Sequence, residues 1–362
     1  MTYEFVTSYE TQVEEFSGKL FRSCLATMEL ANIELGIRLG LYAPLAGAGG
    51  LTSAELSSRA GINERYASEW LEQQAVAGVV VVDDQDKPAA LRRFALPDAH
   101  ALVLLDDDSD ACMKPAAAVA PWVAKAIAIM ESEFKEGSGA PFGLFDLHDL
   151  QAAFTRPVFA NHLCQSWLPA VPDIQAKLDA GDRVRIAEVG CGEGLAAIEI
   201  ARRYAHAQID GYDLDYASVK AARAAATIAG VSGRVRFDVR DASDSELRGN
   251  YDLVMAIEML HDVRDPVGVL RSMKALAKDD GAVLIVDERT AEKFSVPASE
   301  MERLFYSFST LHCLAVSMYE NGAGTGTLIR PDTVRRYANE AGFANVEILD
   351  VEHPQFRLYR LS

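Results

Sequence analysis

The segment Glu188-Val-Gly-Cys-Gly-Glu-Gly194 constrains the fold of this chain more than any other stretch. The apolar run from Val184 to Val189 is typical of a buried strand, whereas apolar residues recur at helical spacing from Leu195 to Ala201. The three glycines between them remove side chains where the chain must turn and where a ligand can approach the backbone. The segment therefore predicts a strand, a glycine-rich turn and a helix, with a ligand at the turn.

The spacing of these glycines argues against a dinucleotide as the ligand. The pattern Gly-x-Gly-x-x-Gly, counted from Gly190, requires a glycine where Leu195 stands, and no Lys-Ser/Thr pair of a phosphate-binding loop follows. The carboxylate of Glu188 would repel a pyrophosphate and attract a cation. The segment resembles motif I of the class I S-adenosylmethionine-dependent methyltransferases, whose cofactor carries an ammonium and a sulfonium but no phosphate.

Further strands follow in the order that this resemblance implies. We expect strands over 208–212, 234–239, 251–257 and 282–287, with Asp213 and Asp241 directly after the first two. A carboxylate at the end of the second strand is suited to accept both ribose hydroxyls. The alternative is that either aspartate is only a helix cap or a loop carboxylate. The resemblance implies cofactor contacts from Glu188, Gly190, Gly192, Gly194, Asp213, Leu214, Asp241 and Ala242.

The amino-terminal part has the pattern of a winged helix-turn-helix. A long helix with apolar residues at helical spacing is expected over 9–39, followed by two short helices within 51–75 and two short strands at 79–82 and 91–95. A DNA-binding helix needs basic residues, but Glu64, Glu69 and Glu72 outnumber Arg65 on the second short helix. In the small-molecule O-methyltransferases of plants and bacteria, which the chain resembles, this module serves dimerisation and closes part of the substrate site.

The expected architecture is therefore α/β, with more than one domain, because 362 residues exceed a comfortable single domain. We expect a winged-helix dimerisation domain over 1–105 and a helical connector over 106–180 that contributes to the substrate pocket. A Rossmann-like, seven-stranded methyltransferase domain should follow over 181–362. Its last two strands, 346–351 and 356–361, should form an antiparallel hairpin. A homodimer through the 9–39 helix is the expected assembly.

Catalytic candidates follow the fourth strand, because ligands of open α/β sheets lie at the carboxyl ends of the strands. His261 could remove a proton from an acceptor hydroxyl, and Asp262 could orient it. Leu260-His261-Asp262 matches the segment that carries the catalytic histidine of plant-type O-methyltransferases, although Val263 replaces the usual tryptophan. The alternative is a structural His261. For His312, on an expected helix over 305–319, the alternatives are acceptor binding and burial in the core.

Composition excludes several other classes of function. The net charge of −18 opposes binding to nucleic-acid phosphates. The five cysteines are scattered without a Cys-x-x-Cys pair or a Cys/His cluster, so neither a metal site nor a disulfide framework is expected. With no 18-residue apolar stretch and no signal sequence, a cytoplasmic protein that does not enter the membrane is expected.

The function that these features indicate is S-adenosylmethionine-dependent methyl transfer to a hydroxyl of a small, apolar or aromatic acceptor. Two alternatives stay open. One is a winged-helix transcriptional regulator that senses the cofactor, and the other is a catalytically inactive partner that binds it.

Overall fold

The structure is a computed structural model that describes residues 8–47, 49–244 and 246–362. The first seven residues of the expected 1–105 domain lie outside the described residues. The chain divides into two compact units, Met1–Trp122 and Val123–Ser362, and each unit is described by itself. No helix among the described residues is both long and apolar enough to cross a membrane.

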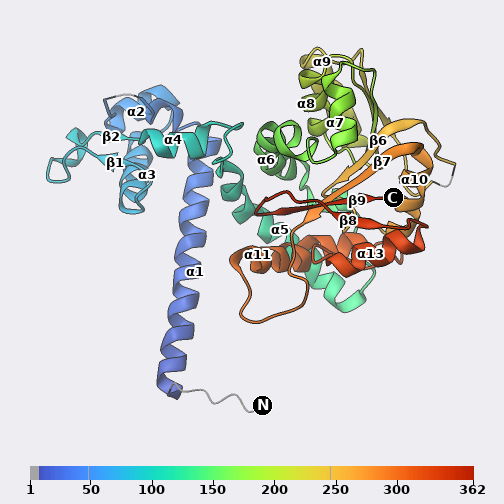
Figure 1. Ribbon diagram of the computed structural model, residues 1–362. Coiled ribbons are helices and arrows are strands. Elements are labelled where there is room, and N and C mark those ends of the chain that lie inside the picture. The colour runs from blue at the N-terminus through green and yellow to red at the C-terminus, as the bar shows by residue number, and fades with distance from the viewer. Residues whose placement is uncertain (1–7, 48, 245) are drawn as a thin grey trace. The chain divides into compact units, whose positions relative to one another are not determined.

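The first unit is a winged helix-turn-helix preceded by a long helix, as the sequence predicts (Figure 1). Its two strands pair antiparallel but are shorter than expected, because the N–H groups of Val79 and Val80 bond to the carbonyl of Gln74 at the end of a helix. The elements are α1 (Tyr9–Arg38), a 3-10 turn (Ala43–Leu45), α2 (Ser53–Ala60), α3 (Glu64–Val76), β1 (Val81–Val82), a second 3-10 turn (Ala89–Leu91), β2 (Phe94–Ala95) and α4 (Asp98–Leu105).

Within the part of this unit that the structure describes, α1 packs against the other elements through its carboxyl end. A Cβ on Gly36 would lie 2.3 Å from Cζ2 of Trp70 on α3, and the indole N–H of Trp70 donates to the carbonyl of Asn32 at 3.0 Å. Toward the amino end, α1 exposes large apolar side chains, including Phe16 (60% exposed) and Phe21 (70%). Figure 1 shows α1 extending well past α2 and α3. Such an exposed apolar stripe is typical of an interaction surface.

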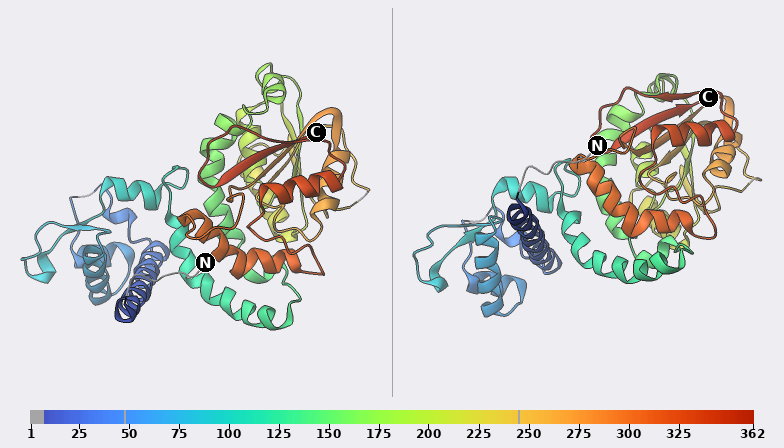
Figure 2. Two further views of the ribbon diagram at one scale, coloured as in Figure 1. Left: turned by 60° about the horizontal axis from the view of Figure 1, so that its bottom comes forward. Right: turned by 90° about the horizontal axis from the view of Figure 1, so that it is seen from below.

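The second unit has a central sheet with helices on both sides (Figure 2). The helix α5 (Lys114–Glu136) begins in the first unit and ends in the second. The elements after it are a 3-10 turn (Phe142–Phe145), α6 (His148–Val158), a π-helix (Phe159–Trp167), α7 (Pro172–Asp179), β3 (Arg185–Val189), α8 (Leu195–Arg203), β4 (Gln208–Asp213), α9 (Tyr216–Ile228), β5 (Val235–Val239), β6 (Tyr251–Ile257), α10 (Pro266–Leu276), β7 (Ala277–Glu288), α11 (Glu300–Phe308), a π-helix (Ser309–Cys313), α12 (Leu314–Met318), α13 (Pro331–Glu340), β8 (Val346–Ile348) and β9 (Phe356–Leu361).

The sheet has seven strands in the order β5-β4-β3-β6-β7-β9-β8. The strands from β5 to β7 are parallel to one another, and β9 is antiparallel to both β7 and β8, so the expected closing hairpin is confirmed. The chain leaves β3 toward β4 on one side and reaches β6 on the other. Such a reversal of strand order opens a crevice for ligands at the carboxyl ends of the strands.

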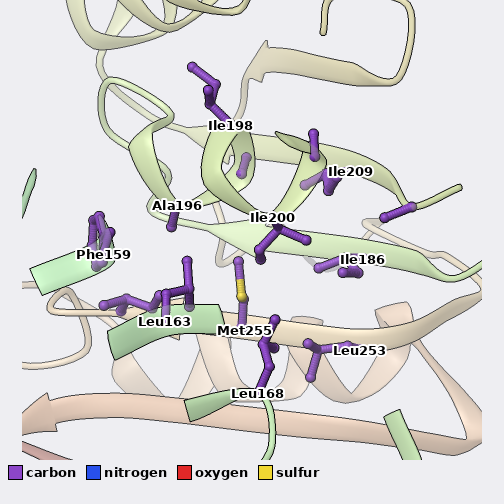
Figure 3. Close-up of a cluster of buried hydrophobic side chains, with 14 of the residues drawn as sticks. Phe159, Leu163, Leu168, Ile186, Ala196, Ile198, Ile200, Ile209, Leu253 and Met255 are labelled. Atoms are coloured by element: carbon purple, nitrogen blue, oxygen red, sulfur yellow. The ribbon is translucent and has the colours of Figure 1, made fainter. Parts of the chain in front are cut away.

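Alternate residues of each strand supply two cores, one on each face of the sheet. On one face, Ile186, Leu253 and Met255 pack against α7, α8 and the first π-helix, and Figure 3 shows Met255 between Ile200 and Leu163. On the other face, Val254 and Ile285 belong to the core built by α10 and α13. Burial on both faces holds the strand ends rigidly at the crevice.

The prediction of one continuous helix over 305–319 was wrong, because a π-helix interrupts the segment. It is divided into α11, the π-helix Ser309–Cys313 and α12, and the N–H of Leu314 bonds to the carbonyl of Ser309. The wider turn changes which side chains face inward, and it contains His312. Such π segments inside helices occur frequently at functional sites.

Candidate active site

A cavity of about 570 Å³ opens at the carboxyl ends of β3, β4 and β6. Its volume lies within the range of about 300–1,000 Å³ that small-molecule sites occupy. Most of the residues expected to contact a cofactor line it, and Asp262 lines it too. These are Glu188, Gly190, Gly192, Asp213, Leu214, Asp241 and Ala242. Of the site residues predicted from the sequence, Gly194, His261 and His312 do not line the cavity.

The glycine turn adopts a backbone that other residues rarely reach. Gly190, Gly192 and Gly194 have φ values of 70°, 50° and 76°. A Cβ on Gly192 would meet no described atom within 4 Å, so the backbone there is open to a ligand. A Cβ on Gly194 would instead lie 2.4 Å from Cζ of Phe237. Gly194 is therefore required for packing, whereas Gly192 leaves space at the cavity.

Two carboxylates flank this turn. Asp213, the last residue of β4, accepts N–H bonds from Gly192 at 2.8 Å and Asp215 at 2.9 Å, and burial raises its pKa despite these bonds. Glu188 on β3 is buried and accepts the N–H of Ala197 at 3.1 Å. Burial, with the charge of Asp213, raises the pKa of Glu188 to about 8. A cationic ligand would stabilise the charged form of both groups.

Asp241 is held by a network of its own. It accepts bonds from the N–H and hydroxyl of Ser243 at 2.8 and 2.7 Å, and from Arg264 at 2.7 Å. Burial alone would raise the pKa of Asp241, but these partners hold it below its usual value. Arg264 also contacts Glu320 after α12. The arginine thus connects three loops at the rim of the cavity, all of which supply lining residues.

His261 lies beneath the cavity lining and has carboxylates on both sides of its ring. Nδ1 is 2.7 Å from Asp287 and 2.9 Å from Glu288, and Nε2 is 3.3 Å from Asp262. Burial alone would lower the pKa of His261, but these carboxylates raise it well above its usual value. Of these contacts, the one between Nδ1 and Asp287 is a hydrogen bond. The raised pKa favours the protonated ring, and an imidazolium has no lone pair to accept a proton. This geometry favours the structural alternative for His261.

Two overlapping groups among the described residues have the composition of a metal-ligand set, His261 with Asp262 and Cys313, and His261 with Asp287 and Glu288. Donor atoms of His261, Asp287 and Glu288 lie within 4.8 Å of one another. Nδ1 makes a hydrogen bond with Asp287 at 2.7 Å, and the Glu288 oxygen lies 2.9 Å away as an ion-pair contact. We therefore interpret the group as a buried ion-pair network.

His312 is buried among aromatic rings. Its ring meets those of Phe142 and Phe145 edge to face, with centroids 5.3 and 4.7 Å apart. Burial lowers its pKa to about 4, so the ring is neutral at pH 7. Because the side chain does not line the cavity, the structure favours the core alternative for His312.

Several polar side chains of the lining were missed by sequence reasoning, and Glu258, His148 and Arg264 are among them. Glu258 is the first residue after the apolar strand β6, which was a usable signal because strand ends face the crevice. His148 opens α6, and its Nε2 lies 3.3 Å from a carboxylate oxygen of Asp215. His148 lies far from the glycine turn in the sequence, so no local sequence pattern linked it to the site.

The rest of the lining includes an apolar wall. Phe142 and Phe159 come from the expected connector, and Val316 and Tyr319 come from the end of α12. Met259 and Val263 add apolar surface from the loop after β6. The cavity therefore combines carboxylates at the strand ends with an apolar surface suited to a second, less polar ligand.

Comparisons with known proteins agree with this geometry. Residues 181–342 match a family model described as a methyltransferase domain, and residues 26–105 match one described as an Rv2258c-like winged HTH domain. The ubiquinone biosynthesis O-methyltransferase of Burkholderia pseudomallei is 25% identical over 217 residues, which cover 60% of this chain and 82% of that protein.

Other curated relatives are matched over shorter segments. The ubiquinone biosynthesis O-methyltransferase of Bordetella bronchiseptica is 40% identical over 103 residues, which cover 27% of this chain and 40% of that enzyme. The polyketide synthase ThaQ of Burkholderia thailandensis is 32% identical over 103 residues, 28% of this chain but only 5% of the synthase.

Solved structures share the fold over nearly the whole chain. A structure described as PigF with SAH is 17% identical, with a TM-score of 0.68 and coverage of 98% of this chain and 99% of that one. An O-methyltransferase family protein from Burkholderia thailandensis is 19% identical, with a TM-score of 0.66 and coverage of 99% and 98%. The mitomycin 7-O-methyltransferase MmcR also has a TM-score of 0.66, at 17% identity and coverage of 98% and 99%.

Proposed function

We propose that this chain, which combines a class I methyltransferase fold with an amino-terminal winged-helix domain, transfers a methyl group from S-adenosylmethionine to a hydroxyl of a small, apolar or aromatic molecule. One observation carries the proposal. The neighbouring strands β3, β4 and β5 bring Glu188, Asp213 and Asp241 to one cavity, around a glycine turn whose backbone is open at Gly192.

This set of groups fits the cofactor. Carboxylates at the ends of neighbouring strands suit a ligand that carries cationic groups and hydroxyls, and they oppose a pyrophosphate. When bound, S-adenosylmethionine supplies an electrophilic methyl group on a sulfonium. We propose that Asp213 accepts the ribose hydroxyls and that Leu214, Asp241 and Ala242 surround the adenine, while Glu188 and the glycine turn hold the methionine part.

The acceptor would lie against the apolar wall. Phe142 and Phe159 support the proposal that the 106–180 connector contributes to the substrate pocket, because both line the cavity. Holding the acceptor next to the methyl group with water excluded supplies most of the catalysis expected for such a transfer. Catalytic roles for His261 and Asp262 stay predictions, and the paired ring of His261 supports a positioning role.

We also propose a homodimer through the amino-terminal domain, which would extend over 1–105. Its support is the exposed apolar stripe of α1, which the rest of the first unit leaves uncovered. The cytoplasmic location stays a prediction from the sequence. DNA binding is disfavoured, because Arg65 on α3 pairs with Glu69 and Glu72 pairs with Arg92 at 2.7 Å.

The proposal is tested by product formation. We expect the purified chain to form S-adenosylhomocysteine when S-adenosylmethionine is mixed with suitable members of a panel of phenols, and not with the corresponding methyl ethers. If the chain binds the cofactor and a DNA duplex without turnover, the regulator hypothesis replaces this one. If it binds the cofactor alone with neither DNA binding nor turnover on any hydroxyl, amine or carbon acceptor, the inactive-partner hypothesis does.

A further inference from the structure

Glu258 occupies an unusual position at the cavity. It directly follows β6, next to the point where the strand order reverses, and its N–H donates to the carbonyl of Val286 at 2.8 Å. Its φ is 54°, in the left-handed region that residues other than glycine rarely adopt. Strained backbone of this kind is concentrated at functional sites, where the surrounding structure holds a side chain in place.

The carboxylate of Glu258 is available for chemistry. The side chain is half-buried and lines the cavity, whereas its Oε2 is shielded from solvent and has no hydrogen-bond partner among the described residues. Burial raises the pKa of Glu258 to about 7; His261 opposes this rise, and Asp287 and Asp262 add to it. A carboxylate that titrates near neutral pH is matched to general acid–base catalysis.

Several ionisable groups around Glu258 are engaged by other partners. His261 lies outside the lining, and its Nδ1 makes a hydrogen bond of 2.7 Å with Asp287. Asp213 and Asp241 accept hydrogen bonds from backbone or arginine donors, and the proposed function assigns both to the cofactor. Glu258 and Asp262 both line the cavity, and each has one carboxylate oxygen without a hydrogen-bond partner among the described residues. Glu258 differs from Asp262 in its left-handed backbone, which fixes the side chain at the end of β6.

We propose that Glu258 is the general base of the reaction, an inference that rests on the proposed function. As the acceptor oxygen bonds to the methyl carbon, the carbon–sulfur bond breaks and its electron pair returns to sulfur, while the hydroxyl proton passes to the Glu258 carboxylate. The imidazolium of His261 favours the ionised form of Glu258 from beneath the lining. His261 is then a positioning residue rather than the base.

The central experiment compares wild type with Glu258→Gln, which keeps the shape of the side chain but cannot take the proton. We expect turnover on a phenolic acceptor to fall about a hundredfold to ten-thousandfold, with the affinity for S-adenosylhomocysteine changed less than about threefold. The wild-type rate should rise with pH to a plateau above about pH 7, and this step should vanish in the variant. Glu347→Gln, on the exposed surface of β8, is the matched control and should behave as wild type.

Two measurements that do not depend on turnover complete the test. Infrared difference spectra should show a carboxyl group that titrates near pH 7 in wild type and not in Glu258→Gln. Glu258→Gly should melt at about the same temperature as wild type, because glycine accepts the left-handed backbone, but it should be inactive. A purely structural Glu258 would instead lower the melting temperature in both variants.

A failure of the base assignment can be distinguished from a failure of the proposed function. If Glu258→Gln keeps the wild-type rate, or if it loses cofactor affinity but turns over normally at saturation, the base assignment is wrong and the proposed function stands. If wild type binds no S-adenosylhomocysteine, the proposed function itself is wrong.

Discussion

The backbone N–H of Gly192 donates to the Oδ2 of Asp213 at 2.8 Å. This bond joins the glycine turn after β3 to the end of β4, so the two parts of the expected cofactor site hold each other in place. Asp213 fixes the turn through this bond, and its oxygens keep lone pairs for the proposed cofactor.

Replacing Asp213 with Ala should weaken cofactor binding. Hydrogen bonds to a charged group contribute about 1.5–3 kcal/mol, which corresponds to about a 10- to 150-fold increase in Kd. Calorimetry with S-adenosylhomocysteine measures this. Asp238→Ala, an exposed carboxylate on the next strand, is the control. Equal affinity of Asp213→Ala and wild type would remove Asp213 from the site.

Gly194→Ala should destabilise the second unit more than Gly230→Ala does. Both glycines have positive φ, 76° and 71°, so a left-handed alanine costs about 1–2 kcal/mol at either position. Only at Gly194 would the Cβ also overlap a neighbour, the ring of Phe237, which adds about 1–3 kcal/mol. Urea denaturation reports the difference. Equal losses would mean that Phe237 yields without cost.

The double variant Phe16→Asp with Leu20→Asp should convert the proposed dimer into a monomer. The two side chains are 60% and 56% exposed on α1, and burying a carboxylate in an apolar interface is strongly unfavourable. Light scattering at tens of micromolar measures the mass. Tyr66→Asp, on the exposed surface of α3, is the control and should stay dimeric. A wild-type chain that is monomeric under these conditions contradicts the proposal.

His261 and His312 should affect stability with opposite pH dependence. Loss of a buried ion pair costs about 3–5 kcal/mol, so His261→Gln should be strongly destabilising. Because the folded pKa of His261 is raised, its stabilisation is complete below about pH 6.5 and is lost as pH rises through the folded value. The pKa of His312 is lowered to about 4, so its burial becomes costly as pH falls below about 6.5.

Denaturation of His261→Gln and His312→Gln between pH 5 and 9 separates the two effects. Relative to wild type, the deficit of His261→Gln should shrink toward high pH, and that of His312→Gln should shrink toward low pH. The same trend in both variants would show that the carboxylates around His261 do not hold it charged.

The sequence predicted the parts of the fold that depend on local patterns. Strands and helices have residue periodicities that the geometry of the backbone imposes, so the seven-stranded sheet and the bounds of β6 were confirmed. The first strand of the winged helix is shorter than predicted. The N–H groups of Val79 and Val80 are used in the turn after α3, where they bond to the carbonyl of Gln74. The π-helix at Ser309–Cys313 has the composition of an ordinary helix and left no signal.

The site was harder to predict where it depends on tertiary contacts. Asp213 could be located from its position at a strand end. The state of His261 could not, because Asp287 and Glu288 come from a different strand, and their charges decide its protonation. The position of Glu258 after β6 could be seen in the sequence. Its proposed catalytic role rests on burial and a left-handed backbone, which the sequence does not reveal.

Calorimetry can show whether the crevice at the glycine turn binds S-adenosylmethionine. We predict that S-adenosylmethionine and S-adenosylhomocysteine bind one site per chain with micromolar Kd, about −8 kcal/mol, that Asp213→Ala weakens both, and that NAD gives no heat of binding. Binding of NAD, with no binding of S-adenosylmethionine or its demethylated product, would contradict the account.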